Sequence, residues 1–205
     1  RWNFDVPVGL GKAVELELTL RLVRGENHVQ LAFARASDGN AQHRLDDDDP
    51  VTLILRPDIE DRNFHETTKA SIGPEAQWPW AITPQADGFA FKPASGHTLE
   101  MALPGGSFVH EAEWTYGVPH PFEADRGLSG DGDVFSPGYF TVELSGEATA
   151  VLSAGMDAHG VTAALPPPVA PTTGDPLPLM DAMKTGMEAF IVKRDDTRTV
   201  IAGYP

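Results

Sequence analysis

The side chains of residues 14–22 alternate strictly between apolar and polar, and this alternation constrains the fold more than any other feature. Val14 and every second residue as far as Leu22 are apolar, whereas the residues between them are Glu, Thr or Arg. Successive side chains of a strand point to opposite faces, so this period predicts a half-buried β-strand. A helix would instead place its apolar residues three or four positions apart.

A second alternating run follows directly. Residues 24–27 read Arg-Gly-Glu-Asn, which is a turn signal, and Val29, Leu31 and Phe33 alternate after it. Two alternating runs joined by a short Gly-containing loop predict a β-hairpin.

Short apolar runs continue along the chain, separated by turn signals rich in Gly, Pro, Asp and Ser. The sequence contains 18 Pro and 20 Gly, which divide it into short segments. No helical period persists before about residue 175. These features predict an all-β, antiparallel sandwich over residues 1–164. The further predicted strands are 51–55, 88–91, 97–103, 108–114, 139–144 and 148–152.

Residues 165–178 read LPPPVAPTTGDPLP, a run that cannot continue a sheet or a helix. We expect an extended, semi-rigid linker here, followed by a truncated segment over 179–205. Asp175 and Pro176 predict the start of one short helix. Its apolar stripe, at helical spacing, consists of Leu179, Met183, Met187 and Phe190.

Composition excludes several classes of function. The formal net charge of −15 argues against nucleic acid and anionic membranes as partners, because both are polyanions. It is compatible with a neutral substrate such as a carbohydrate. The absence of Cys removes disulfides and thiolate chemistry and is consistent with a cytoplasmic protein. No apolar run is long enough to span a bilayer.

The sequence offers little support for a metal or a cofactor. The seven His residues lack the spacing of a metal site, and no Gly-rich phosphate loop is present. The acidic run Asp46–Asp49 could bind a metal or form a solvated loop. The solvated loop is favoured because calcium loops need spaced ligands and a Gly. We therefore expect neither a metal nor a cofactor.

Two regions combine Arg, aromatic and carboxylate residues in what the sequence indicates are loops. One is 62–65, and the other runs from Trp114 through 123–128 to 133–140. Such loops favour sugar binding or a domain interface. In the alternative interpretation, the Arg residues pair with nearby carboxylates and hold the loops in shape. The candidate residues are Arg62, His65, Trp114, Glu123 and Arg126.

Glycosidase chemistry within the chain would need two carboxyl groups facing each other across a sugar. Glu123, Asp131 and Asp133 are the loop residues that could supply them. Sequence spacing alone does not place any two of them in that geometry, so catalysis within this chain is not favoured.

The same segments resemble the N-terminal domain of bacterial and archaeal glycogen-debranching enzymes. Matching motifs include R-P at 56–57, an R-N-F-H loop at 62–65, E-x-x-R-G-L at 123–128 and D-V-F-S-P-G-Y-F at 133–140. Residues 189–205 resemble the entry into that family's catalytic domain, where a W-G-R-D segment follows. We therefore expect the chain to be cut from a longer one.

The resemblance implies an antiparallel β super-sandwich that leads into an (α/α)₆ catalytic toroid, absent here, with amylo-α-1,6-glucosidase activity. It implies glycogen or maltodextrin as the cytoplasmic substrate, bound through the parent enzyme, and the catalytic domain as partner. The candidate loops would then bind substrate or hold the two domains together, and this segment alone would be inactive.

The match has departures. The family's R-Y-H-G segment is absent, so the sandwich is expected to begin part-way through, and Asn63 stands where the family has Asp. These departures leave the glycan specificity open. A second hypothesis, from another class, is a stand-alone carbohydrate-binding or scaffold β-sandwich. A reading frame that continues past Pro205 would separate the two.

Overall fold

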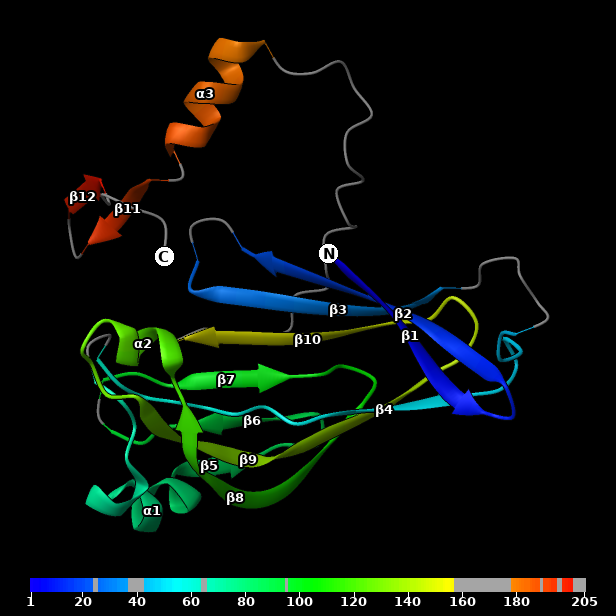
Figure 1. The fold of residues 1–205 in the computed structure, drawn as a ribbon, viewed down its shortest axis with the longest axis horizontal. Helices are drawn as coiled ribbons and strands as arrows, with labels where there is room; N and C mark the ends of the chain where they lie inside the picture. Colours follow the sequence, from blue (N-terminus) through cyan, green and yellow to red (C-terminus); the bar gives the residue numbers. More distant parts are fainter. Residues whose placement is uncertain are drawn as a thin grey trace. The chain divides into compact units, whose positions relative to one another are not determined.

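The fold is seen in a computed structural model, shown in Figure 1. The structure describes residues 1–23, 26–36, 43–63, 66–94, 96–156, 178–188, 190–194 and 197–200. The chain divides into two compact units, Arg1–Ala164 and Leu165–Pro205. Within the described part of the chain, no helix is long and apolar enough to cross a membrane.

A large antiparallel sheet forms one layer of the first unit. Among the described residues it has seven strands, ordered β1-β2-β3-β10-β7-β6-β5. The hairpin predicted from alternation is confirmed as β2 and β3, with Leu18 opposite Phe33 and Leu20 opposite Leu31. The strands are β1 (Trp2–Gly9), β2 (Lys12–Leu22), β3 (His28–Ala36), β5 (Ile82–Pro84), β6 (Gly88–Phe91), β7 (Leu99–Ala102) and β10 (Thr149–Met156).

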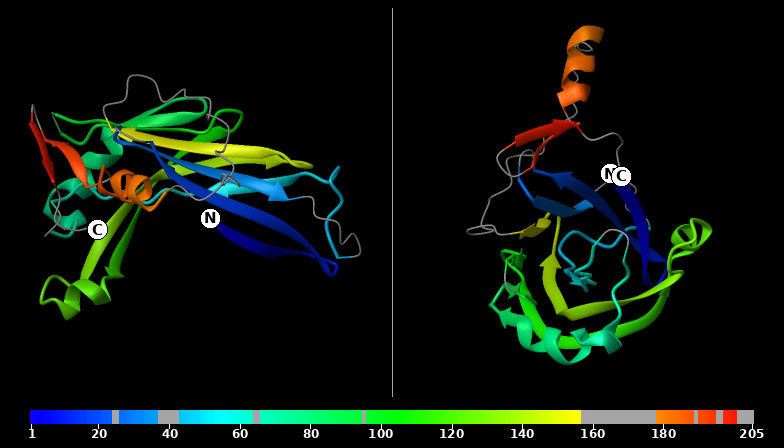
Figure 2. Two further views of the ribbon diagram at one scale, coloured as in Figure 1. Left: turned by 90° about the horizontal axis from the view of Figure 1, so that it is seen from above. Right: turned by 90° about the vertical axis from the view of Figure 1, so that its left-hand side faces the viewer.

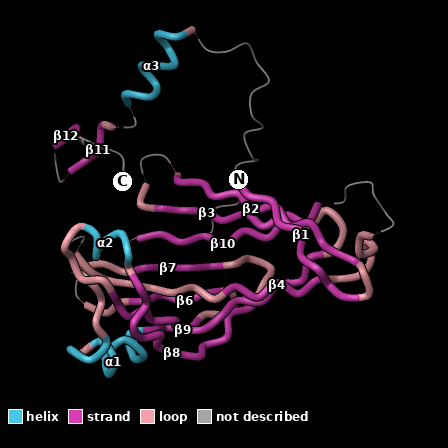
Figure 3. Tube along the Cα trace, in the orientation of Figure 1, coloured by secondary structure: helices cyan, strands magenta, loops and turns pink. Residues whose placement is uncertain are grey.

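A smaller sheet forms the second layer. Its order is β4-β9-β8, with β4 at Val51–Leu55, β8 at Ser107–Pro119 and β9 at Asp131–Leu144. Figure 2 shows the two layers facing each other, and Figure 3 shows that strands account for most of this unit. The predicted all-β, antiparallel sandwich is confirmed.

The core between the sheets is aromatic. Phe135 and Phe140 of β9 are fully buried, as is Phe89 of β6, at 1% exposure. Trp78 packs edge-on against Phe135 with ring centroids 5.9 Å apart, and it stacks on Trp114 at 5.1 Å. Rings of this size bury large apolar areas, so this cluster supplies much of the driving force that joins the layers.

The long hairpin β8–β9 corrects one prediction. Trp114, where the predicted strand 108–114 gives way to the predicted loop, lies inside paired strands, and so do residues 133–138, which the sequence indicated as a loop. Register shifts at 110–113 and 115–118 break the alternation of β8, so the sequence pattern does not show that the strand continues beyond Trp114. A Gly in the sequence is a turn signal, but Gly138, at φ +144, instead lets the backbones of β8 and β9 pack closely. A Cβ there would lie 2.0 Å from the carbonyl oxygen of Val109.

Strand β1 was not predicted, although its side chains alternate. Trp2 lies opposite Leu18 and Phe4 opposite Leu16, so both side chains lie on the face that carries the core. Each is 49% exposed. The core side of the sheet therefore extends past the buried cluster at this edge.

Four short helical segments lie in the first unit. In the part of the chain described, they are η1 (Ala70–Ile72), α1 (Pro74–Gln77), η2 (Trp78–Ala81) and α2 (Pro121–Asp125). Pro begins α1 and α2 and holds the second position of η2. There its fixed φ suits a helix and its missing N–H is not needed.

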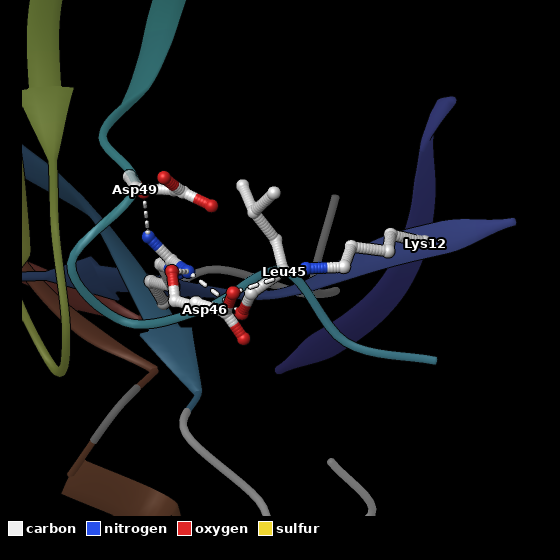
Figure 4. Close-up of polar contacts among 5 residues, drawn as sticks. Lys12, Leu45, Asp46 and Asp49 are labelled. Atoms are coloured by element: carbon white, nitrogen blue, oxygen red, sulfur yellow. Dashed lines mark hydrogen bonds and ion pairs between the residues drawn. The ribbon is translucent and has the colours of Figure 1, made fainter. Parts of the chain in front are cut away.

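The acidic run at 46–49 is a surface loop held through its backbone. The buried guanidinium of Arg35 donates to the carbonyl oxygens of Asp49, Asp46 and Leu45, at 2.6, 2.7 and 3.1 Å (Figure 4). Lys12 pairs with the Asp46 carboxylate at 3.1 Å. No group of three or more His, Asp or Glu side chains in the described ranges is placed to hold a metal.

The second unit contains the predicted helix, as α3 (Leu179–Glu188). Its apolar side chains at 179, 183 and 187 are exposed. An antiparallel pair, β11 (Ile191–Arg194) and β12 (Thr197–Val200), follows it and was not predicted. The predicted linker, apart from Pro178, and the predicted helix start at Asp175–Pro176 lie outside the described residues.

Removing the central ring of the core tests this packing. We expect Phe135→Ala to lower the free energy of unfolding by about 3–5 kcal/mol, through lost burial and the cavity left behind. Phe122→Ala is the matched control, because Phe122 is 79% exposed on α2 and its loss should cost less than about 0.5 kcal/mol. Urea denaturation measures both, and equal effects of the two substitutions would contradict the assignment of the core.

Candidate functional site

The helix α2 occupies the tip of the β8–β9 hairpin and carries two of the predicted site residues. Glu123 lies in the helix, and Arg126 follows at its C-terminus. The N–H groups of Arg126 and Leu128 both donate to the Glu123 carbonyl at 3.0 Å, while Gly127 adopts φ +78. A Gly in this left-handed conformation ends a helix readily, which fixes where Arg126 sits.

A small pocket forms where α2 meets the segment after β4. Arg62 of that segment and Glu123 of α2 face the same pocket, although they are far apart in the sequence. The structure therefore brings together two of the residues predicted from sequence. The lining consists of Arg62, Glu66, Thr67, His120, Glu123, Leu128 and Ser129.

Arg62 is held in place by its own loop. Its Nε lies 3.1 Å from Oε1 of Glu60, and its Nη1 donates to the carbonyl oxygen of Glu66 at 2.8 Å. These contacts favour the interpretation in which Arg62 shapes the loop. They also hold the guanidinium in a defined position at the pocket. His65, predicted beside it, lies outside the described residues.

Arg126 differs from Arg62. Its side chain is exposed, and nothing among the described residues forms an ion pair or a side-chain hydrogen bond with it. The interpretation in which both Arg residues pair with nearby carboxylates therefore fits Arg62 and not Arg126. The Arg126 guanidinium is available to a ligand or a partner.

The interpretation of Trp114 as a surface-loop residue is wrong. Trp114 lies in β8, stacked on Trp78 with an interplanar angle of 30° and 5.1 Å from the Phe135 ring. It is half-buried against the core, and its indole nitrogen is buried without a hydrogen-bond partner. The prediction failed because β8 is bulged on both sides of Trp114. The face of the sheet on which the Trp114 side chain lies could therefore not be deduced from alternation.

Asp133, one of the possible catalytic carboxylates, is buried and accepts two backbone hydrogen bonds. Its Oδ1 accepts the N–H of Gly117 at 3.0 Å, and its Oδ2 accepts the N–H of Ala70 at 2.9 Å. These two donors, Gly117 first, and then the charge of Lys69 hold the pKa of Asp133 below its usual 3.8. Asp131 pairs with Lys69 at 2.6 Å. Both carboxylates therefore fasten residues 68–70 to the hairpin.

The sequence motifs did not include the exposed side chain of Trp80, although the second candidate region included Tyr116. Trp80, on η2, is 89% exposed, and Tyr116 of β8 is 58% exposed. The Tyr116 hydroxyl donates to Oε1 of Glu75 at 2.6 Å, and this bond raises the pKa of Tyr116 above 10.0. The Trp-Pro-Trp run at 78–80 was the sequence signal that could have indicated the Trp80 side chain. Of its two Trp residues, Trp78 is buried and Trp80 is exposed.

Two packed antiparallel sheets, with a charged pocket beside the tip of a long hairpin, define an all-β sandwich module. The family model described as glycogen debranching enzyme N terminal matches residues 1–151. The chain belongs to this family, as the sequence motifs indicated. No curated protein and no solved structure matches the chain.

The two hydrogen bonds that the Asp133 carboxylate accepts from Ala70 and Gly117 should stabilise the fold. In Asp133→Asn the amide presents an NH₂ group to one of the two N–H donors, so a hydrogen bond to a charged acceptor is lost. We expect the free energy of unfolding at neutral pH to fall by about 2 kcal/mol. Asp131→Asn is the control, because this surface ion pair should contribute less than about 1 kcal/mol.

The effect of Asp133→Asn should depend on pH. Because the folded-state pKa is lowered, Asp133 stabilises the fold above its unfolded-state pKa of 3.8, and this contribution is lost as the pH falls through the folded-state value. The gap between wild type and Asp133→Asn should be constant near neutral pH and narrow below about pH 4. A gap that widens in acid would contradict the assignment.

Proposed function

We propose that this chain is the non-catalytic N-terminal domain of a glycogen-debranching-type α-1,6-glucosidase. The observation that carries the proposal is the family match over residues 1–151. In the parent enzyme, the domain packs against the catalytic domain and contributes to binding the α-glucan. Arg62, Glu123 and Arg126 form its binding surface or its domain interface. The parent acts in the cytoplasm on glycogen or maltodextrin.

The chemistry of the carboxylates supports a non-catalytic role. A glycosidase needs one carboxyl group that stays protonated to act as the general acid, and this requires a raised pKa. Asp133 has a lowered pKa and uses both oxygens on backbone donors. Asp131 is paired with Lys69. Of the three carboxylates considered, Glu123 remains, and a single carboxylate does not make the pair that hydrolysis needs.

The pocket residues support contact with a sugar. Arg62 is held in place at the pocket and Glu123 lines it, while Arg126 follows Glu123 in the chain and has an exposed guanidinium. Sugar hydroxyls both donate and accept hydrogen bonds, so guanidinium and carboxylate groups suit them. A glucan is neutral, so the net charge of −15 does not oppose its approach, whereas it would repel nucleic acid and anionic membranes.

The gene sequence distinguishes the proposed domain of a larger enzyme from a stand-alone module. We expect the reading frame to continue past Pro205 into a segment containing Trp-Gly-Arg-Asp and a helical catalytic domain. A stop codon directly after Pro205 in the genome would favour the stand-alone carbohydrate-binding or scaffold sandwich instead.

An activity assay tests the non-catalytic role. The 205-residue chain should release no glucose from a phosphorylase limit dextrin, whereas the full-length parent should release it. Hydrolysis by the short chain that disappears in Glu123→Gln would overturn the proposal.

Binding of maltoheptaose to the 205-residue chain tests the role of Arg126. Removing exposed charged hydrogen bonds should cost about 1 kcal/mol, so Arg126→Ala should raise the Kd about fivefold. Lys184→Ala is the matched control, since Lys184 is also an exposed cation but lies on α3, outside the residues that the family model matches. An Arg126→Ala variant that binds like wild type, in both the short chain and the parent, removes Arg126 from the glucan surface.

A further inference from the structure

Trp80 is an exposed aromatic side chain that the pocket does not include. Its side chain is 89% exposed, whereas Trp78, two positions earlier, is 5% exposed. An exposed Trp offers a partner a flat apolar face together with an indole N–H donor. Burial of Trp80 in a contact would recover apolar area that folding leaves in water.

The backbone beneath Trp80 is fixed on both sides. On one side, the Trp78 ring packs against the rings of Trp114 and Phe91, at centroid distances of 5.1 and 5.3 Å. On the other side, the Ala81 carbonyl accepts the N–H of Lys92 at 3.0 Å. The intervening Pro79 has a fixed φ. Docking on Trp80 therefore orders little more than its own two side-chain torsions.

The helical turn that precedes Trp80 carries a polar group. Helix α1 runs directly into η2 and carries Glu75, which accepts the hydroxyl of the exposed Tyr116 at 2.6 Å. A glucose ring has an apolar C–H face and a rim of hydroxyls, so it needs an aromatic plane together with hydrogen-bonding groups. A carboxylate here disfavours an anionic ligand and accepts readily from hydroxyls.

We propose that Trp80 is a stacking platform for a glucose ring of an α-glucan, with Glu75 and Tyr116 as hydrogen-bonding partners. This surface is separate from the pocket of Arg62 and Glu123, whose lining includes none of the three residues. Both α1 and α2 lie toward the same end of the sandwich (Figures 1 and 2). The proposal rests on the proposed glucan-binding function and gives it a second point of contact.

The test is a titration of the 205-residue chain with maltoheptaose, in which NMR signals monitor binding. Loss of the stacked ring in Trp80→Ala should raise the Kd about tenfold, while Trp80→Phe should retain most of the affinity. The matched control is Trp2→Ala, which removes a half-exposed Trp from β1 at the edge of the large sheet. The unfolding free energy of each variant confirms that the fold is kept.

The outcomes separate this proposal from the proposed function. Weaker binding in Trp80→Ala with normal binding in Trp2→Ala supports the platform. Normal binding in Trp80→Ala but weak binding in Arg126→Ala overturns the platform and leaves the pocket as the glucan surface. If the wild-type chain does not bind maltoheptaose, the platform and the glucan-binding role of the pocket are both overturned, and the domain-interface role of the pocket residues remains. In that case, a loss of activity in the full-length Trp80→Ala parent would assign Trp80 to a protein interface.

Discussion

The buried carboxylate of Asp133 joins three segments on which the rest of the structure depends. It belongs to β9, accepts the N–H of Gly117 from β8, and accepts the N–H of Ala70 where η1 begins. The Ala70 N–H is buried and would otherwise lack a partner, which is costly away from water. Through this group the irregular stretch from 68 to 81 becomes part of the sandwich, although its residues form only short helical turns.

The aromatic core and the exposed surface follow from that bridge. Once Ala70 is fixed, α1 and η2 continue along the layer, and Trp78 enters the stack of Trp114 and Phe135. Trp80 is left in solvent on the same rigid turn. The hairpin that supplies Trp114 also carries α2 at its tip, with Glu123 and Arg126. Both candidate contact surfaces therefore stand on elements anchored in the core, which positions functional side chains more accurately than free loops do.

Sequence patterns predicted the regular parts of this fold and failed where the strands are irregular. Alternation predicted the β2–β3 hairpin because its side chains keep a strict period of two along both strands. The hairpin β8–β9 was partly missed because its bulges interrupt that period, and because Gly138 serves close packing in place of a turn. For the same reason, the sequence could not show that Trp114 points inward. Which of Trp78 and Trp80 is exposed depends on tertiary contacts, which local sequence does not encode.

We propose that the end of the sandwich bearing α1 and α2 contacts α-glucan. The four Trp residues make it directly measurable, because each gives one indole N–H signal in a ¹⁵N–¹H spectrum. On adding maltoheptaose, we expect the signals of the Trp80 indole and of the backbone amides around Arg126 to shift, while those of the buried Trp78 and the remote Trp2 stay unchanged. A spectrum without shifts, or with shifts centred on Trp2, would contradict it.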